Sequence, residues 1–254
     1  TGSGDEALPP GTERRLRILE LGGLYEKRLE RPYEAIDAYE RFLAEVDEFD
    51  TGGDEAPVQL DALAALCELY GRVERWPKVV DALARALDLE RDLAKKRELR
   101  LRLAGIYERE LGQPATAIEH YEAVLGLAGD DEQALAALER LLESQGRWED
   151  LEDVLARRSR KAAGEARIEL VPRRARILEE KLGNPDAAAS ALRELGADAV
   201  VDAEGAASLV RNLRRAGLVH EAARLLAQRA ELLEQRQAPA TEIVDVWLEA
   251  ARLR

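Results

Sequence analysis

Two stretches decide the fold: residues 106–114, IYERELGQP, and residues 142–148, LESQGRW. Versions of both recur in alternation. The first returns at 24–32 (LYEKRLERP) and 177–185 (ILEEKLGNP), and the second at 70–76 (YGRVERW) and 213–219 (LRRAGLV). One Tyr or Leu in each stretch, the reference residue of its repeat, lies at position 25, 70, 107, 142, 178 or 213, so the steps are 45, 37, 35, 36 and 35 residues. Self-similarity at this period is typical of proteins built from stacked repeats.

Each repeat is predicted to be a pair of helices joined by a short turn. In the fourth repeat Leu135, Leu138 and Leu142 form an apolar stripe at helical spacing, and Leu151 and Val154 begin a second one. A glycine between such stripes favours a left-handed helix end, and a proline opens the second helix in four repeats. The pattern predicts helix pairs at 12–30/32–48, 57–74/77–92, 94–111/114–128, 131–145/149–163, 165–182/185–195 and 203–216/219–236, and a terminal helix over 241–254.

Two segments are predicted to lie outside the helices. The long first step locates an insertion at 49–57 (FDTGGDEAP), whose turn formers in an acidic setting predict a protruding loop. Residues 1–11, with Pro9 and Pro10 near their end, are expected to be a tail or linker. The sequence contains no methionine and stops within a helical pattern, so we expect it to be a piece of a longer protein.

The turns are predicted to alternate in length. In the odd repeats ten residues separate the reference residue from the matching position of the second helix (25 to 35, 107 to 117, 178 to 188). In the even repeats the separation is nine (70 to 79, 142 to 151, 213 to 222). We therefore expect alternating turn geometry and a building block of two repeats, or four helices.

The composition excludes several classes of protein. No apolar run approaches the roughly 18 residues of a membrane span, so no membrane insertion is expected, and no signal peptide is visible. The net charge is −13, and residues 1–150 hold 34 acidic and 20 basic residues, so the basic footprint of a nucleic-acid-binding protein is lacking. Only six of the 38 basic residues are lysine, a bias that we attribute to a GC-rich bacterial genome. The single cysteine, Cys67, lies on an apolar stripe and is predicted to be a buried thiol.

The residues at fixed places in the repeats resemble those of the tetratricopeptide repeat family. The first repeat has Leu21-Gly22 and Tyr25 on its first helix, and Ala35 and Tyr39 on its second. The third repeat matches at Leu103, Ala104, Tyr107, Ala117 and Tyr121, and the sixth at Ala222. The resemblance implies an all-α fold: a right-handed α-solenoid of about six helix–turn–helix repeats plus a terminal helix. In the fifth repeat Arg174 replaces the family's Leu and Pro172 precedes it, so a bent helix is expected there.

No residue pattern predicts catalysis, a cofactor or a metal. His120 and His220 have no acidic or cysteine cluster at metal-ligand spacing, which favours surface or half-buried histidines. Neither a GxxxxGK[ST] nor a GxGxxG motif suggests a nucleotide site. Trp76 and Trp148 precede their helices at matching positions and are interpreted as packed turn residues. Trp247, in the terminal helix, is expected to cover the core of a following repeat.

The sequence also suggests a specific binding surface on the first helices of the repeats. The family lines its concave groove with the first helix of each repeat, and that face turns from acidic early in the chain to basic later. Converging guanidinium groups on it could hold an acidic peptide or a carboxylate. The alternative is ordinary pairing and solvation within the chain. The candidate residues are Arg140, Arg173, Arg176, Arg211, Arg214 and Arg215.

The sequence thus favours a protein-interaction or scaffolding module within a larger bacterial protein, with a protein or peptide partner. Two alternatives stay open. The array could be a structural spacer that self-associates through its terminal helix, or the regulatory part of an enzyme whose catalytic domain lies elsewhere. The cytoplasm is slightly favoured as its location.

Overall fold

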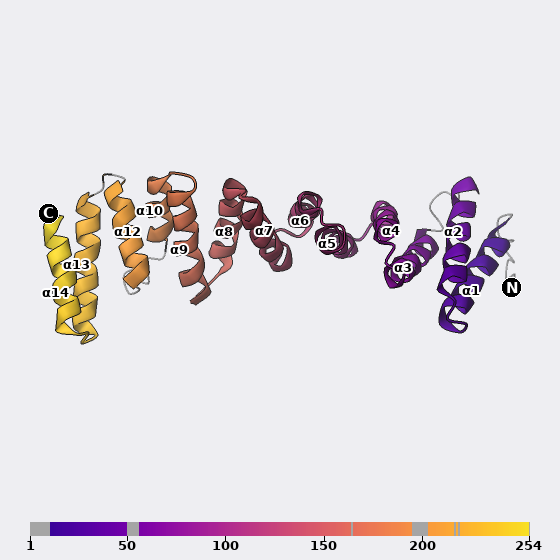
Figure 1. Cartoon of the computed structure of the whole chain (residues 1–254), viewed down its shortest axis with the longest axis horizontal. Coiled ribbons are helices and arrows are strands. Elements are labelled where there is room, and N and C mark those ends of the chain that lie inside the picture. The colour runs from indigo at the N-terminus through magenta and orange to yellow at the C-terminus, as the bar shows by residue number, and fades with distance from the viewer. Residues whose placement is uncertain are drawn as a thin grey trace, which may run out of the picture. The chain divides into compact units, whose positions relative to one another are not determined.

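The computed structural model of the chain describes residues 11–49, 56–163, 165–194, 203–215, 217 and 219–253. Every regular element in these ranges is an α-helix (Figure 1). The helices are α1 (Thr12–Lys27), α2 (Pro32–Phe49), α3 (Ala56–Arg72), α4 (Trp76–Leu89), α5 (Leu93–Arg109), α6 (Pro114–Ala128), α7 (Glu132–Gln145), α8 (Trp148–Lys161), α9 (Glu165–Glu180), α10 (Pro185–Arg193), α12 (Ala203–Arg215), α13 (Val219–Gln235) and α14 (Ala240–Arg252). The predicted all-α class is confirmed, and no described helix end lies more than three residues from its predicted position. None of these helices is long and apolar enough to cross a membrane.

The chain divides into two compact parts, an N-terminal block up to Gly129 and a C-terminal block from Asp130. In the N-terminal block the core is built from the facing stripes of successive helices, with Phe42, Leu63 and Leu83 each 1% exposed. In the C-terminal block the stripes predicted for the fourth repeat are buried, and small residues such as Ala188 fill the space between α9 and α10. Most of the predicted tail and insertion fall outside the described residues.

The turns between paired helices alternate as the spacing predicts. In the odd repeats the reference carbonyl accepts a hydrogen bond from the amide six residues later, as Tyr107 does from Gln113 (2.7 Å) and Leu178 from Asn184 (2.8 Å). In the second and fourth repeats the amide is five residues later, as for Tyr70 and Arg75 (2.9 Å) and for Leu142 and Arg147 (3.0 Å). The position of the left-handed residue differs in the same way. It lies five positions after the reference residue at Gly112 and Gly183, and four positions after it at Gly146 and Gly217. The extra residue of the odd repeats is therefore absorbed entirely in the turn.

Small residues let the paired helices approach closely. A Cβ added to Gly22 would lie 3.0 Å from the ring of Tyr39, so the Leu-Gly position of the first repeat is small because the ring of α2 packs against it. The helix ends are also fixed as expected, since the Asn184 side chain caps α10 by accepting from the amide of Ala187 at 3.0 Å. α9 runs on through Pro172 as one helix, and Arg174 there pairs with Glu152 at 2.6 Å.

Candidate functional site

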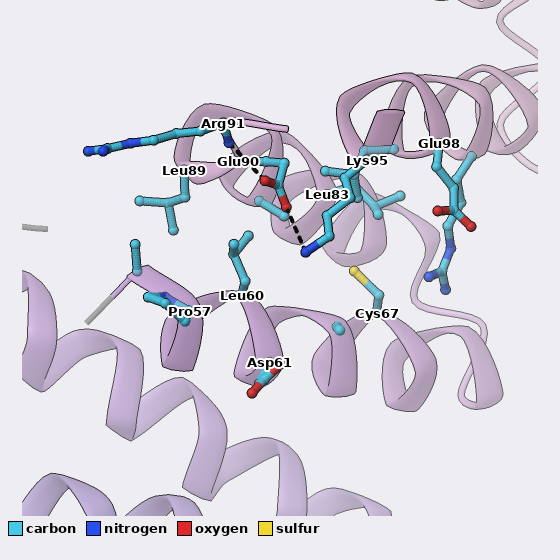
Figure 2. Close-up of a pocket in the computed structure, with 15 residues that line it drawn as sticks. Pro57, Leu60, Asp61, Cys67, Leu83, Leu89, Glu90, Arg91, Lys95 and Glu98 are labelled. Atoms are coloured by element: carbon cyan, nitrogen blue, oxygen red, sulfur yellow. Dashed lines mark hydrogen bonds and ion pairs between the residues drawn. The ribbon is translucent and has the colours of Figure 1, made fainter. Parts of the chain in front are cut away.

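A large hollow lies in the N-terminal block, where α3 faces the end of α4 and the start of α5 (Figure 2). Its volume is about 750 Å³. Leu60 and Cys67 project into it from α3, and Leu83 and Leu89 close it from α4. Pockets of this size with an apolar floor and a polar rim are typical ligand sites.

The rim of this hollow is fixed by Glu90. Its carboxylate accepts hydrogen bonds from the amides of Arg91 (2.8 Å) and Asp92 (2.9 Å) and lies 3.8 Å from the Lys95 ammonium, as the dashed lines of Figure 2 show in part. The amide of Asp92, followed by that of Arg91 and the charge of Lys95, lowers the pKa of Glu90 in spite of some desolvation. The short connection from α4 to α5 is therefore held in one shape at the mouth of the hollow.

A second hollow, of about 440 Å³, continues the first along the same two helices. The two share Cys67 and Arg102 in their linings. At this junction Arg102 of α5 reaches Glu68 of α3 at 2.7 Å. Beyond it the walls are formed by Arg72, Trp76 and Arg109, with others, near the C-terminal ends of α3 and α5. The two hollows together form one groove between α3 and α5, with α4 as its floor, which we call the α3–α5 groove.

Cys67 is a structural thiol, as predicted. It is 1% exposed, and its Sγ donates weakly to the carbonyl of Val79 at 3.9 Å. Burial raises its pKa to about 11, so hardly any thiolate is present near neutral pH. It contributes a small apolar surface to the groove and no nucleophile.

The arginines predicted to line a groove lie in the C-terminal block. Arg173 of α9 bonds to Glu143 of α7 at 2.6 Å and also to the buried Glu139, which a second arginine, Arg158, holds from α8. In this part of the predicted basic face, Arg173 is therefore already paired with acidic side chains of the same chain. Arg140 and Arg176 are exposed on α7 and α9, and each is engaged in an interaction within the chain.

The other three arginines converge on α12. Arg211 and Arg215 both donate to Oε1 of Glu179 on α9, at 3.2 and 2.5 Å. The Glu179 side chain is only 3% exposed, and its Oε2 has no hydrogen-bond partner among the described residues. A hollow of about 520 Å³ on α12 is lined by all three arginines together with Val210 and with Glu249 of α14. Of the six predicted residues, the structure thus brings Arg211, Arg214 and Arg215 to one place.

A substitution within the repeat explains the position of Glu179. The residue after the reference position is Glu26 in the first repeat and Glu108 in the third, and each accepts a hydrogen bond from the tyrosine 13 residues later, at 2.9 and 3.2 Å. In the fifth repeat that tyrosine is replaced by Leu192. Glu179 is the equivalent carboxylate, and the arginines of the next repeat supply the partners that the missing hydroxyl would have given. The sequence carries this signal in the 13-residue spacing, but the prediction did not use it.

The remaining candidates have structural roles. His120 is half-buried, stacks on Tyr107 with ring centroids 5.3 Å apart, and lies with Nδ1 3.1 Å from Arg100. Burial and then the Arg100 charge lower its pKa. Trp76 and Trp148 begin α4 and α8, half-buried beside a glycine of the preceding helix end. Within the described residues no group of three or more His, Cys, Asp or Glu could hold a metal ion.

Trp247 is more engaged than expected. It packs half-buried against the core of the C-terminal block, and its Nε1 donates to Glu234 of α13 at 3.0 Å. The large apolar side chains that α14 exposes are instead Val244 and Leu248, at 53% and 51%.

Comparison with known proteins agrees with the repeat pattern. Residues 99–133 and 134–167 match the family model of the tetratricopeptide repeat. No curated protein matches the sequence. Solved structures that resemble the chain include a TPR repeats protein from Bacteroides fragilis (10% identity, TM-score 0.48, 94% of this chain and 99% of that one) and a tetratricopeptide repeat protein from Parabacteroides merdae (14%, 0.43, 95% and 93%). A third is YrrB, described as a TPR protein with an unusual peptide-binding site (12%, 0.38, 94% and 92%). The family model thus covers the third and fourth repeats, and helix–turn–helix pairs of the same kind lie before and after them.

Proposed function

We propose that the chain is a non-catalytic docking module that holds an acidic segment of a partner protein at the arginines of α12. Tetratricopeptide repeats form protein-interaction modules, and the finer proposal concerns the site and the partner. The observation that carries it is the convergence of Arg211, Arg214 and Arg215 on one open hollow.

The charge balance at this hollow favours an anionic ligand. Three guanidinium groups face two carboxylates, those of Glu179 and Glu249, and Glu179 is buried behind the arginines. The side chains of Arg211 and Arg215 are 52% and 57% exposed, so solvent reaches both guanidinium groups while they bond to Glu179. Arg214 has no carboxylate partner among the described residues. Guanidinium groups bind carboxylates with paired hydrogen bonds, which makes an Asp- or Glu-rich segment the fitting partner.

The test is the binding of a fluorescent peptide of ten residues, alternately Glu and Gly, measured by anisotropy. Arg214→Ala should weaken binding by about fivefold or more, because one charge-assisted contact is lost while the bonds to Glu179 remain. Arg224→Ala, on the exposed side of α13, is the matched control and should leave the affinity unchanged. Equal affinities for the two variants would disprove docking at α12.

Self-association through α14 is a second candidate, favoured by its exposed Val244 and Leu248. Two large apolar side chains one helical turn apart are suited to packing against a second copy. Light scattering should show oligomers that disappear when the chain is shortened to end at Gln237. A monomer at all concentrations of the unshortened chain would exclude this candidate.

A further inference from the structure

The turns between the paired helices of the first and second repeats combine positive charge with exposed apolar side chains. The exposed residues that we group as the basic turn edge are Lys27, Arg28, Leu29, Arg31, Tyr33, Arg72, Arg75 and Lys78. We infer that this edge binds an anionic lipid surface, with Leu29 and Tyr33 in the interfacial layer of the bilayer. Such binding is peripheral and uses no membrane-spanning helix. It belongs to the N-terminal block and does not depend on the docking proposed for α12.

The positive charge of these two turns is not a general property of the repeats. Residues 27–33 and 70–78 each contain three basic residues and one acidic residue, so each stretch has a net charge of +2. The equivalent stretches of the later repeats, 109–115, 142–150, 180–186 and 213–221, have net charges of 0, −2, −1 and +1. The whole chain carries −13. The basic turn edge is therefore a local exception within an acidic chain.

Most cations of the basic turn edge are not neutralised within the chain. Those without a carboxylate partner among the described residues are Lys27, Arg28, Arg72 and Arg75. The other two make contacts that are open to solvent: Arg31 lies 3.4 Å from Glu34, and Lys78 lies 3.6 Å from Glu40. Exposed guanidinium and ammonium groups of this kind can pair with the phosphate and carboxylate groups of anionic lipids.

Leu29 and Tyr33 are exposed at positions where the other repeats bury a side chain or have no large one. Leu29 is 56% exposed, whereas the equivalent Leu111 and Leu182 are half-buried against the cores of their blocks. Tyr33 is 58% exposed, and the third and fifth repeats have alanine and aspartate at the same position. Packing of the repeat therefore does not account for this apolar pair.

Arg75 brings the cations of the second turn beside the apolar pair of the first. Its Cζ lies 5.8 Å from the centroid of the Tyr33 ring. An aromatic and an aliphatic side chain surrounded by cations match the layers of an anionic membrane. Aromatic rings are enriched at the level of the headgroups, and Lys and Arg keep their charged ends there while their stems lie along apolar surface.

The shape of the site favours a lipid surface over an acidic segment of a protein. Leu29 and Tyr33 lie at a turn, and neither lines the α3–α5 groove. A protein partner would therefore have to provide a pocket for two exposed side chains. The interfacial layer of a bilayer admits apolar side chains without a preformed pocket, and its affinity rises with the apolar area buried and with the attraction of cations to anionic lipids.

The acidic residues of α2 do not prevent this binding. α2 begins at Pro32, and its exposed Glu40 and Asp47 follow eight and fifteen positions later. These positions lie about 12 and about 22 Å along the helix. Salt at physiological concentration screens exposed charges beyond about 8 Å. A bilayer in contact with the turns is therefore affected mainly by the charges of the turns themselves.

The test is co-sedimentation of the whole chain with lipid vesicles. Vesicles of phosphatidylcholine that contain about 30% phosphatidylserine should bind the chain at least about tenfold more tightly than vesicles of phosphatidylcholine alone. Raising the salt concentration from about 0.1 to about 1 M should remove most of this difference, because the attraction is screened. Equal binding to the two kinds of vesicle would overturn the inference.

Paired substitutions of cations locate the binding surface. Lys27→Gln with Arg28→Gln should weaken binding to the phosphatidylserine vesicles at least about tenfold, because each cation near the surface contributes about fivefold. Arg91→Gln with Lys95→Gln is the matched control, with the same loss of charge beyond the far end of α4, about 20 Å from its start. Circular dichroism confirms that the variants are folded. A loss of affinity that is equal in the two double variants would contradict binding through the turns.

The apolar pair is tested at constant charge. Leu29→Ser with Tyr33→Ser should weaken binding about fivefold or more. Leu29→Cys that carries a polarity-sensitive dye should show a blue shift of its emission when the phosphatidylserine vesicles are added, and Arg91→Cys with the same dye should not. The native Cys67 is buried and takes up little dye. Emission from the dye at position 29 that does not change on binding would exclude entry of Leu29 into the bilayer.

A last comparison separates the lipid surface from other partners. The peptide of alternating Glu and Gly serves as the acidic protein segment. If the chain binds this peptide but no vesicle, and Lys27→Gln with Arg28→Gln weakens that binding, the edge docks a protein and the inference is wrong. Arg214→Ala should leave binding to the vesicles intact, so failure of the site on α12 and failure of the basic turn edge are distinguishable.

Discussion

The bonds that hold Glu179 predict that removal of its arginine partners destabilises the chain much more than removal of the carboxylate itself. The carboxylate is 3% exposed, while its partners Arg211 and Arg215 are about half exposed. Removal of both arginines by Arg211→Ala and Arg215→Ala leaves a buried charge without compensation. A buried pair broken in this way loses about 3 to 5 kcal/mol of stability. We expect about 3 kcal/mol, the lower end, because water can reach the carboxylate once the two exposed side chains are gone.

Removal of the carboxylate should be far less harmful. Glu179→Gln leaves two arginines that are already exposed to water, and it removes the charge whose Oε2 has no partner. The neutral amide keeps an oxygen that can accept from the arginines and carries no buried charge to desolvate, which offsets part of the lost bonding. We therefore expect Glu179→Gln to lower the unfolding free energy by no more than about 1 kcal/mol. Combining it with both arginine substitutions should restore most of the stability lost by the pair alone.

Urea unfolding followed by circular dichroism gives the unfolding free energy of the unsubstituted chain, the double arginine variant, Glu179→Gln and their combination. Urea is used because it does not screen charges as guanidinium salts do. Arg193→Ala is the control, because its partner Glu221 is half exposed and the pair should contribute less than about 1 kcal/mol. If Glu179→Gln destabilises the chain as much as the two arginine substitutions together, burial of the carboxylate is not what governs this cluster.

Three further outcomes follow from single positions. Gly126→Ala, at an exposed position of α6 with no atom within 4 Å of the added Cβ, should stabilise the chain by about 0.5 to 1 kcal/mol. Gly146→Ala, at φ +66°, should destabilise it by about 1 kcal/mol in the same urea assay. The pKa of His120 in the folded chain lies below its ordinary value of 6.5, so the folded state binds fewer protons than the unfolded one, and stability should fall as the pH is lowered from about 7 to about 5. His120→Gln should reduce this loss of stability. An unchanged pH dependence of the urea midpoint in this variant would contradict the prediction. Cys67, with a pKa of about 11, should react with iodoacetamide at about pH 8 roughly a hundredfold more slowly than a small free thiol, as mass spectrometry over time can show.

Local features were predictable from the sequence because they depend on neighbours in the chain. Apolar periodicity locates the helices, and glycine or proline at fixed offsets locates their ends. The buried state of Cys67 follows from the same periodicity. Even the alternation of the turns could be read from one additional residue between Tyr107 and Ala117.

Contacts between repeats were harder to predict from the sequence, because they depend on how one helix pair is rotated against the next. The predicted basic face placed Arg211, Arg214 and Arg215 together, but Glu139 and Glu179 were not expected to bind arginines of the following repeat. The α3–α5 groove was missed for a related reason. Its size results from small residues on α3 that face another helix across a gap, and a helical pattern does not show which repeats leave such a gap.

The alternation of the turns also restricts how the array can be edited. Removal of one repeat would join two turns of the same kind in succession, each with its left-handed residue at the same offset. Removal of two consecutive repeats would leave the order of long and short turns unchanged. Chains shortened or lengthened by about 71 residues are therefore expected to keep every turn in its native setting, and changes of about 35 residues are not. Recombination within such a gene would retain a working protein most readily when it exchanges repeats in pairs.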